Sequence, residues 1–201
     1  NYVEKYSEQE SELLQELNHE TWEKILTPRM LSGHLQGRVL SMLSHMIQPT
    51  NILEIGTYTG YSALCLAEGL KENGSIDTID INEELENFVK KYFDKAGLSN
   101  TIKQHIGNAL DIIPTLNKKY DIIFIDADKS NYINYYNLVL DMANPGGYII
   151  ADNVLWSGKV TEPIEEMDED TKTLVEYAKH LANDNRVQQV VFPVRDGLLI
   201  A

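Results

Sequence analysis

The stretch that decides the fold is Asn51-Ile-Leu-Glu-Ile-Gly-Thr-Tyr-Thr-Gly-Tyr-Ser62. The apolar run at residues 52–55 predicts a short buried strand, and the two glycines after it predict a tight turn. An amphipathic segment at residues 61–71 then predicts a helix. A strand, a glycine turn and a helix in this order begin a βαβ unit, in which a second, parallel strand follows the helix.

The rest of the chain repeats this alternation of apolar runs and amphipathic segments. We expect further strands at residues 75–80, 101–106, 120–125 and 148–151, and helices at 83–96, 109–116 and 132–142. Strands that alternate with helices form a parallel, doubly wound sheet. The tail differs, because a helix at 171–182 precedes two strands, 187–192 and 198–201, that only a short turn joins. So short a link makes these two strands antiparallel. The predicted fold is therefore α/β, with a mostly parallel seven-stranded sheet that ends in a C-terminal antiparallel hairpin.

The first third of the chain is predicted to form extra N-terminal helices. One spans about residues 13–25 and another about 35–46. The second has an apolar face of five residues at helical spacing: Leu35, Val39, Met42, Leu43 and Met46. We expect this face, Met42 and Met46 included, to pack in the core. No repeat or flexible linker interrupts the chain. We therefore predict a single domain, 1–201, with N-terminal helices at 1–48 and an α/β core at 51–201.

Composition and charge argue against several classes of protein. The 201 residues carry 17 Lys and Arg against 31 Asp and Glu, a formal net charge of −14. Broad binding to nucleic acid or to an anionic membrane needs a basic surface, which this chain lacks overall. A single cysteine, Cys65, excludes an internal disulfide framework and is typical of a reducing compartment. With no signal peptide and no membrane-length apolar run, the chain is predicted to be cytoplasmic, with no membrane partner.

Two features of the first βαβ unit predict a bound small molecule. Gly56 and Gly60 let the backbone approach a ligand and aim amide groups at an anion. Their G-x-x-x-G spacing differs from the G-x-G-x-x-G of dinucleotide binders and favours a smaller group, such as an amino-acid carboxylate. Asp80 ends the next strand, where an acid can accept hydrogen bonds from ribose hydroxyls. The alternatives are a tight turn that packs helix on sheet, and a helix N-cap at Asp80.

Acidic and amide side chains also end the later strands. Asp126 follows the strand at 120–125, and Asp152 and Asn153 follow the strand at 148–151. The carboxyl ends of parallel strands share one edge of an open sheet, so these side chains are expected to converge there. Their hard oxygen donors suit Mg²⁺, Mn²⁺ or Ca²⁺ and argue against zinc. Lys129 lies three residues after Asp126. Its alternative role is that of a surface lysine paired with Asp128.

Three motifs, in order along the chain, carry a resemblance to a known family: Glu54-Ile-Gly-Thr-Tyr-Thr-Gly-Tyr-Ser62, Asp126-Ala-Asp-Lys-Ser-Asn-Tyr132 and Asp152-Asn-Val-Leu-Trp-Ser-Gly158. They resemble the cation-dependent S-adenosylmethionine O-methyltransferases. This group contains the catechol and caffeoyl-coenzyme A O-methyltransferases and their small bacterial relatives. The resemblance runs from about Met30 to the C-terminus, and it implies a Rossmann-like methyltransferase fold.

The resemblance also implies the roles of particular residues. The set implied to bind S-adenosylmethionine is Met30, Glu54, Gly56, Thr57, Tyr58, Ser62, Asp80, Ala109 and Asp126. In the family, the acid corresponding to Glu54 binds the methionine part, Asp80 corresponds to the ribose ligand, and Met30 lies near the reactive methyl. The loop that contains Ala109 flanks the adenine. Asp126, Asp152 and Asn153 are implied to bind Mg²⁺, or Mn²⁺ or Ca²⁺, and Lys129 is the implied base.

The chemistry implied for these residues is methyl transfer to a hydroxyl group. A neutral hydroxyl is a weak nucleophile, and a divalent ion lowers the pKa of a hydroxyl that it binds. A nearby lysine can accept the proton. Two adjacent hydroxyls on an aromatic ring would chelate the ion, so the expected acceptor is a small catechol-like aromatic molecule. A homodimer is also expected, because the N-terminal helices carry much apolar surface and family members often pair.

Other interpretations stay open at this point. A nicotinamide dehydrogenase would share the sheet and Asp80, but it would need G-x-G-x-x-G and has no use for Asp152-Asn153. A non-catalytic cofactor-binding module predicts cofactor binding without metal dependence. The same chemistry on a hydroxylated uridine of tRNA would need a local basic patch, for which the candidates are Arg29, Arg38 and Arg195. Residues 162–170, rich in acids, are expected to form a solvated loop.

Overall fold

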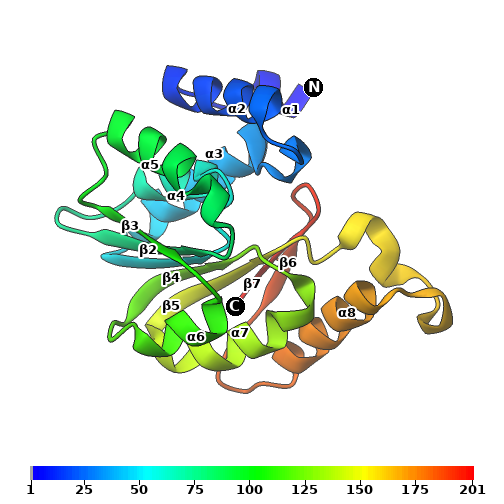
Figure 1. Cartoon of the computed structure of the whole chain (residues 1–201). Coiled ribbons are helices and arrows are strands. Elements are labelled where there is room, and N and C mark those ends of the chain that lie inside the picture. The colour runs from blue at the N-terminus through cyan, green and yellow to red at the C-terminus, as the bar shows by residue number, and fades with distance from the viewer. Residues whose placement is uncertain (1) are drawn as a thin grey trace. The chain divides into compact units, whose positions relative to one another are not determined.

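The structure, a computed structural model, describes residues 2–201, which divide into two compact units, residues 2–108 and 109–201. The first unit contains three strands, β1 (Asn51–Ile55), β2 (Ser75–Asp80) and β3 (Ile102–Ile106). Its helices are α1 (Tyr2–Lys5), α2 (Glu12–Lys24), α3 (Gly33–Ile47), α4 (Tyr61–Ala67) and α5 (Glu86–Lys95). Figure 1 shows α4 and α5 on one side of these strands, with α2 outside them.

The three strands of the first unit are parallel, in the order β3-β2-β1. Their centres are apolar, and Ile52, Leu53, Ile76 and Ile79 are almost fully buried. Ile55 pairs with Ile79, so β1 and β2 end at the same level. This register brings the glycine turn after β1 next to Asp80, the last residue of β2.

The second unit contains strands β4 (Tyr120–Ile125), β5 (Ala143–Asp152), β6 (Val190–Phe192) and β7 (Leu198–Ile200). Its helices are α6 (Ala109–Ile112), α7 (Tyr132–Val139) and α8 (Glu169–Ala182), which lie together on one side of β4 and β5 (Figure 1). The strand order is β4-β5-β7-β6, with β4 and β5 parallel and β7 antiparallel to both of its neighbours. Ile125 pairs with Ala151, so Asp126 and Asp152 follow the strands at the same end.

The predicted fold class is confirmed, because residues 2–201 form seven strands, mostly parallel, with a C-terminal antiparallel pair. Strand β5 begins at Ala143, before the predicted start at residue 148, and its pairing with β4 is irregular near Pro145-Gly146-Gly147. Strand β6 is shorter than predicted, at Val190–Phe192. The single-domain organisation stays a prediction.

The predicted core face of α3 is wrong. Met42 and Met46 are 62% and 73% exposed, and no residue of the five-residue apolar face is fully buried. The helix instead buries Gln36, Gly37, Leu40, Ser41 and Ser44. The physical reason is close packing, because a side chain at Gly37 would collide with Tyr61 and Cys65 of α4. Only the side of α3 with small residues can approach α4 this closely.

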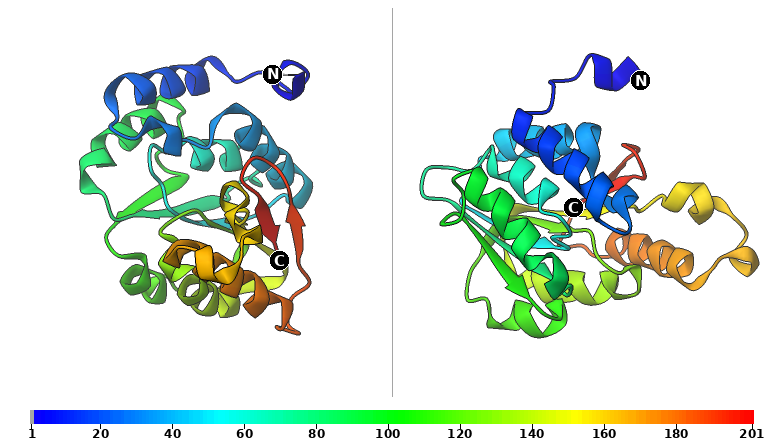
Figure 2. Two further views of the ribbon diagram at one scale, coloured as in Figure 1. Left: turned by 90° about the vertical axis from the view of Figure 1, so that its right-hand side faces the viewer. Right: turned by 45° about the horizontal axis from the view of Figure 1, so that its top comes forward.

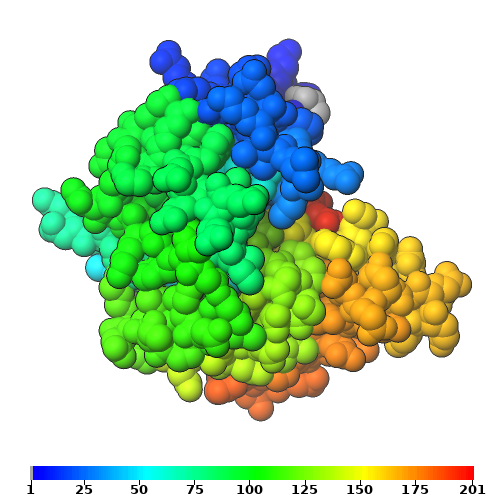
Figure 3. Space-filling view, viewed as in Figure 1, coloured from blue at the N-terminus to red at the C-terminus, as the bar shows by residue number. Residues whose placement is uncertain are grey.

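The segment between β5 and α8, residues 153–168, projects from the second unit and is called the projecting segment here. It is seen in the two views of Figure 2 and as a protrusion in Figure 3. It contains two 3-10 turns, η6 (Trp156–Thr161) and η7 (Ile164–Glu166). Most of its side chains between Glu162 and Asp170 are exposed, as expected for a solvated acidic loop. Among residues 2–201, no helix has the length and apolar character needed to cross a membrane.

Candidate active site

The glycine turn after β1, residues 56–60, has a backbone conformation that requires glycine at two positions. Gly56 and Gly60 have φ angles of 106° and 85°, where a side chain would be strained. A β-carbon at Gly60 would also come within 2.9 Å of the Phe93 ring. Tyr58 has a φ of 48°, and its backbone amide donates to Oδ2 of Asp80 at 2.6 Å. We call residues 56–60 the cofactor loop.

Asp80 ties the cofactor loop to the end of β2. Besides the Tyr58 amide, it accepts a hydrogen bond from the backbone amide of Asn82 at 2.8 Å, through Oδ1. The helical turn that follows is capped by Asn82, whose side chain accepts from the amide of Glu84. The N-cap of this helical turn is therefore Asn82 and not Asp80. The half-exposed carboxylate of Asp80 has acceptor positions left for a ligand, because each oxygen has two lone pairs.

Glu54 lies fully buried beneath the cofactor loop. Its two carboxylate oxygens accept hydrogen bonds from Ser62 Oγ at 2.6 Å and from Thr78 Oγ1 at 2.5 Å. Thr78 also shares a 2.6 Å hydrogen bond with Thr57 of the loop. Glu54 thus joins β1, β2 and the first turn of α4 through hydroxyl groups. Its predicted contact with the methionine part of a cofactor stays a prediction.

Met30 belongs to a short segment that contacts the same loop. The Tyr58 hydroxyl donates to the carbonyl oxygen of Thr27 at 2.9 Å, and the Thr27 hydroxyl lies 3.2 Å from the Met30 sulfur. Met30 is 60% exposed, and Leu26, four residues before it in the sequence, is 99% exposed. Of the predicted cofactor residues, this unit therefore brings Met30, Glu54, Gly56, Thr57, Tyr58, Ser62 and Asp80 into one connected network. Ala109 and Asp126 lie in the second unit.

In the second unit, Asp126 after β4 and Asn153 after β5 converge on one ammonium group. Lys129 is only 7% exposed. Its Nζ atom lies 2.8 Å from Oδ1 of Asn153 and 3.4 Å from Oδ1 of Asp126. It also donates to the Tyr132 hydroxyl at 2.5 Å. We call Asp126, Lys129, Tyr132, Asp152 and Asn153 the Lys129 cluster.

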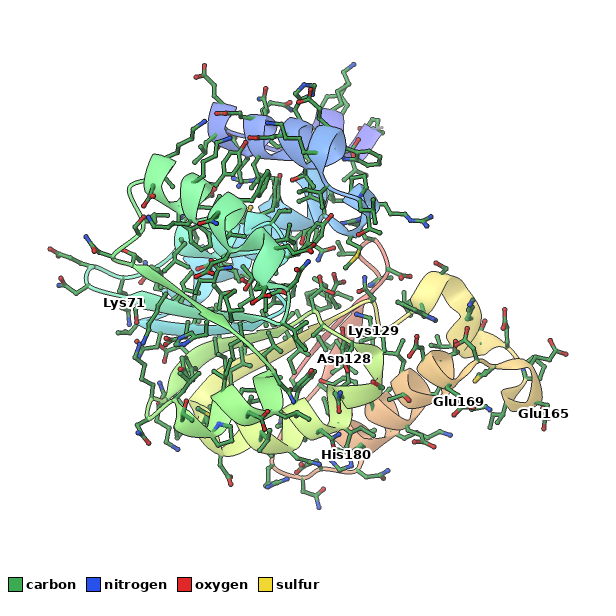
Figure 4. The ribbon with its side chains drawn as sticks, viewed as in Figure 1. Lys71, Asp128, Lys129, Glu165, Glu169 and His180 are labelled. Carbon is green, nitrogen blue, oxygen red and sulfur yellow. The ribbon has the colours of Figure 1, made fainter. Side chains whose placement is uncertain are left out.

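The alternative role of Lys129, a surface lysine paired with Asp128, does not hold. Asp128 accepts hydrogen bonds from Ser130, Asn131 and the Tyr135 hydroxyl instead. Figure 4 shows Lys129 and Asp128 together in the loop after β4, and Glu165 far out on the projecting segment.

Backbone geometry after β5 fixes the other members of the cluster. Asp152 is 2% exposed, and its Oδ1 accepts from the backbone amide of Asn153 at 2.7 Å. Asn153 has a φ of 59°, a left-handed conformation that asparagine tolerates better than most residues. The turn at Asp196 braces the residues that follow, because its backbone oxygen and its carboxylate accept from the amides of Leu155 and Ser157. These bonds place Trp156, whose ring centroid lies 5.7 Å from the Lys129 ammonium.

The cluster has the donor set that a hard divalent ion prefers. Asp126 and Asp152 supply carboxylate oxygens and Asn153 an amide oxygen, with no sulfur or imidazole. Within residues 2–201, no group of three His, Cys, Asp or Glu side chains is placed to hold a metal. The proposed site does not count as such a group, because its third donor is the side-chain amide oxygen of Asn153. The position of Lys129 supports the fit of these donors to a divalent cation, since the oxygens of Asn153 and Asp126 already face its ammonium group.

Sequence reasoning assigned no role to three residues of these networks. Thr78 bridges Glu54 and Thr57, Asp196 braces the loop that carries Trp156, and Tyr132 contacts Lys129. Only Tyr132 had a local signal, since residues three apart at a helix start are neighbours. The other two contacts join positions distant in the sequence.

An open depression of about 660 Å³ on the second unit lies outside these networks. It is lined by residues of α7, α8 and the turn after α8, including Ile133, His180 and Arg186, and by no predicted site residue. Its charge is already compensated, because Arg186 pairs with Asp184 at 2.6 Å. No predicted catalytic, cofactor-binding or metal-binding residue therefore lies in this depression.

Comparison with known proteins agrees with the motifs and the fold. Residues 4–201 match the family described as O-methyltransferase. A caffeoyl-CoA O-methyltransferase of Nicotiana tabacum is 38% identical over 179 residues, which cover 82% of this chain and 73% of that protein. The Medicago sativa caffeoyl-CoA O-methyltransferase is also 38% identical, with coverage of 82% and 71%.

Solved structures of methyltransferases are similar to this chain over nearly its whole length. An SAH-bound methyltransferase of Podospora anserina has a TM-score of 0.91 and 28% identity, covering 99% of this chain and 91% of the other. An O-methyltransferase of Bacillus cereus in complex with SAH has a TM-score of 0.90 and 28% identity, with coverage of 99% and 94%. The chain therefore belongs to the O-methyltransferase family, with a Rossmann-like methyltransferase fold, and it is an S-adenosylmethionine-dependent O-methyltransferase.

Proposed function

We propose that this enzyme transfers the methyl group to a hydroxyl of a small catechol-like aromatic acceptor and that the transfer depends on Mg²⁺. The observation that carries the proposal is the Lys129 cluster, in which a nearly buried ammonium faces hard oxygen donors from the ends of two adjacent strands. The names of the plant relatives, caffeoyl-CoA O-methyltransferases, support an aromatic hydroxyl as the acceptor.

Each residue has a defined task in this proposal. The cofactor loop and Asp80 bind S-adenosylmethionine, with backbone amides for its carboxylate and an acidic side chain for its ribose. Asp126, Asp152 and Asn153 hold the divalent ion, which when bound lowers the pKa of the acceptor hydroxyl. Lys129, in its neutral amine form, takes up the hydroxyl proton and becomes the ammonium. The half-buried Trp156 and the exposed Met30 are the apolar surfaces that we assign to the aromatic ring and to the reactive methyl.

Metal dependence is tested with labelled cofactor, a panel of catechols and varied Mg²⁺. Asp152→Ala is expected to abolish Mg²⁺-dependent transfer while calorimetry still detects cofactor binding, because the cofactor contacts belong to other residues. Asp170→Ala, which removes an exposed carboxylate from the start of α8, is the matched control and is expected to keep wild-type turnover. Full wild-type turnover in excess chelator would contradict the role of the metal.

A hydroxylated uridine in tRNA is the second candidate acceptor, and the structure weakens its support. Arg38 is one of the three candidate arginines for the basic patch that this acceptor would need. Its guanidinium instead contacts both carboxylate oxygens of Glu68, at 2.7 and 3.0 Å. Adding hydroxyuridine-containing RNA to the acceptor panel tests this candidate directly. A non-catalytic module is disfavoured, because it would leave the buried ammonium of Lys129 without a task.

We also propose that the enzyme acts as a homodimer in the cytoplasm. Cys65 is buried and forms no disulfide, and burial raises the pKa of its thiol to about 12, so it is a structural thiol suited to a reducing compartment. The surface that we assign to the dimer is the exposed apolar face of α3.

A further inference from the structure

Tyr132, the first residue of α7, is fully buried although it carries a hydroxyl group. The hydroxyl contacts three polar groups. It accepts from the Lys129 ammonium at 2.5 Å, and it lies 2.9 Å from the carbonyl oxygen of Asp152 and 3.4 Å from that of Ile125. These two carbonyls belong to the ends of β5 and β4. One phenol therefore connects the lysine with both strands that carry the proposed metal ligands.

The hydrogen-bond directions follow from the number of protons available. An ammonium has three donors and no acceptor, so Lys129 donates to Tyr132, Asn153 and Asp126. The Tyr132 hydroxyl must then use its single proton for a carbonyl, and that of Asp152 is the nearer. The Tyr132 hydroxyl thus accepts a hydrogen bond from the lysine and donates one to the end of β5. It fixes the position of the lysine relative to that strand.

The ring of Tyr132 cannot easily move. It packs edge-to-face on Tyr177 of α8, with the ring centroids 5.5 Å apart. Tyr177 is itself fully buried. The Lys129 ammonium lies 4.6 Å from the centroid of the Tyr132 ring, within the range of a favourable cation–π contact. A flexible lysine side chain, which otherwise has many rotamers, is thereby confined to one position.

We propose that Tyr132 is a positioning residue for methyl transfer, which holds the side-chain nitrogen of Lys129 at Asn153 and Asp126 through its buried hydroxyl. The inference rests on the proposed function, in which the side-chain nitrogen of Lys129 must be held facing the acceptor hydroxyl. Tyr132 does not touch the reactants in this proposal. Its contribution passes entirely through Lys129.

A double-mutant cycle tests this dependence. Wild type, Tyr132→Phe, Lys129→Gln and the double variant are compared at saturating Mg²⁺ and S-adenosylmethionine, with catechol as the acceptor and a labelled methyl group. Tyr132→Phe removes one oxygen atom and is expected to lower kcat about 10- to 100-fold, because small displacements of a reacting group are that costly. The KM for S-adenosylmethionine is expected to stay the same. In the Lys129→Gln background, Tyr132→Phe is expected to change kcat by less than about twofold.

A second readout needs no turnover. Denaturant unfolding of the same four proteins without metal is expected to show coupling, with the double variant losing less stability than the two single variants together. Tyr136→Phe is the matched control, since Tyr136 lies fully buried on the same helix and donates to Asp184 at 2.9 Å. It is expected to keep wild-type kcat.

The possible failures are distinguishable. If Tyr132→Phe lowers kcat by the same factor with and without Lys129, its role is structural and the positioning role is overturned. The same follows if Tyr132→Phe has wild-type kcat, or if Tyr136→Phe loses as much kcat as Tyr132→Phe. Absence of Mg²⁺-dependent transfer in the wild-type enzyme, by contrast, overturns the proposed function itself.

Discussion

A lysine ammonium that is 7% exposed has lost most of its water, and desolvation of a charge is unfavourable unless protein groups replace the water. Lys129 meets this requirement with a carboxylate, an amide oxygen and a phenol. A surface lysine would have no need of such a set. These contacts fix the position of the side-chain nitrogen, and the proposed base role requires a fixed position.

Arginine at position 129 separates the charge of this residue from its ability to exchange a proton. Lys129→Arg keeps the cation, but arginine does not deprotonate near neutral pH. We expect kcat to fall by roughly 10²–10⁴-fold, with cofactor affinity kept. The loss should be smaller for a nitro-substituted catechol, whose hydroxyl is already acidic. Rates over a catechol series measure this, and near-wild-type turnover with every acceptor would assign activation to the metal alone.

Asp80 offers a second test at the scale of one residue. Asp80→Ala removes the charged acceptor proposed for the ribose, and cofactor binding measured by calorimetry is expected to weaken by about 1.5–3 kcal/mol. Because Asp80 also accepts from the amides of Tyr58 and Asn82, part of this loss comes from the loop. Asp80→Asn keeps one acceptor oxygen and separates the two contributions. Unchanged affinity in both variants would leave Asp80 a purely structural residue.

At the scale of elements, sequence patterns predicted the strands and the points at which they end. Alternation of short apolar runs with amphipathic segments placed Glu54, Asp80, Asp126 and Asp152 at or near strand ends, where the structure has them. This worked because a strand end and its polar residue are adjacent in sequence. The Tyr132 contact with the end of β5 was not predictable in the same way, since it joins positions 20 residues apart.

Helix α3 shows where periodicity alone misleads. Its apolar stripe predicted a core face, yet the side with Gly37, Ser41 and Ser44 is buried against α4. Periodicity identifies two faces of a helix, but the space available decides which face packs inward. The buried hydroxyl of Ser44 is satisfied by a hydrogen bond that it donates to the carbonyl oxygen of Leu66 at 2.6 Å. The close approach of α4 was not visible from the residues of α3 alone.

Helix α2 is attached to α5 by charges, which gives a prediction for acid stability. Hydrogen bonds from Lys24, and then from Lys91 and Tyr92 of α5, lower the pKa of Glu20 from 4.5 to about 2. A lowered pKa means that ionised Glu20 stabilises the folded state above pH 4.5 and loses this effect as the pH falls towards 2.

Glu20→Gln should therefore reduce the loss of thermal stability between pH 5 and pH 3. The expected difference from wild type is small, about 1–4 °C, because the side chains lie near the surface. Glu23→Gln on the same helix, exposed in the structure, is the control and should keep the wild-type pH dependence. Identical pH profiles for Glu20→Gln and wild type would contradict the contribution of this cluster.

For the whole molecule, the uneven distribution of charge points to self-association. A net charge of −14 keeps copies of the chain apart through most of their surface. The apolar face of α3 carries no charge, and Met42 and Met46 on it are largely exposed. A helix face of this kind on a charged protein is typical of an interface, and a two-fold dimer can bury the same face from both copies. We therefore assign the proposed homodimer to α3.

Light scattering at micromolar concentration is expected to give twice the chain mass of 22.9 kDa. Met42→Lys combined with Met46→Lys places like charges opposite each other across the two-fold axis and should give monomers. Ile164→Lys, on an exposed residue of the projecting segment, is the control and should stay dimeric. The edge strand β6 also exposes apolar side chains, so Val191→Lys is the competing variant. Monomers from Val191→Lys alone would move the interface to β6, and a monomeric wild type would contradict the dimer altogether.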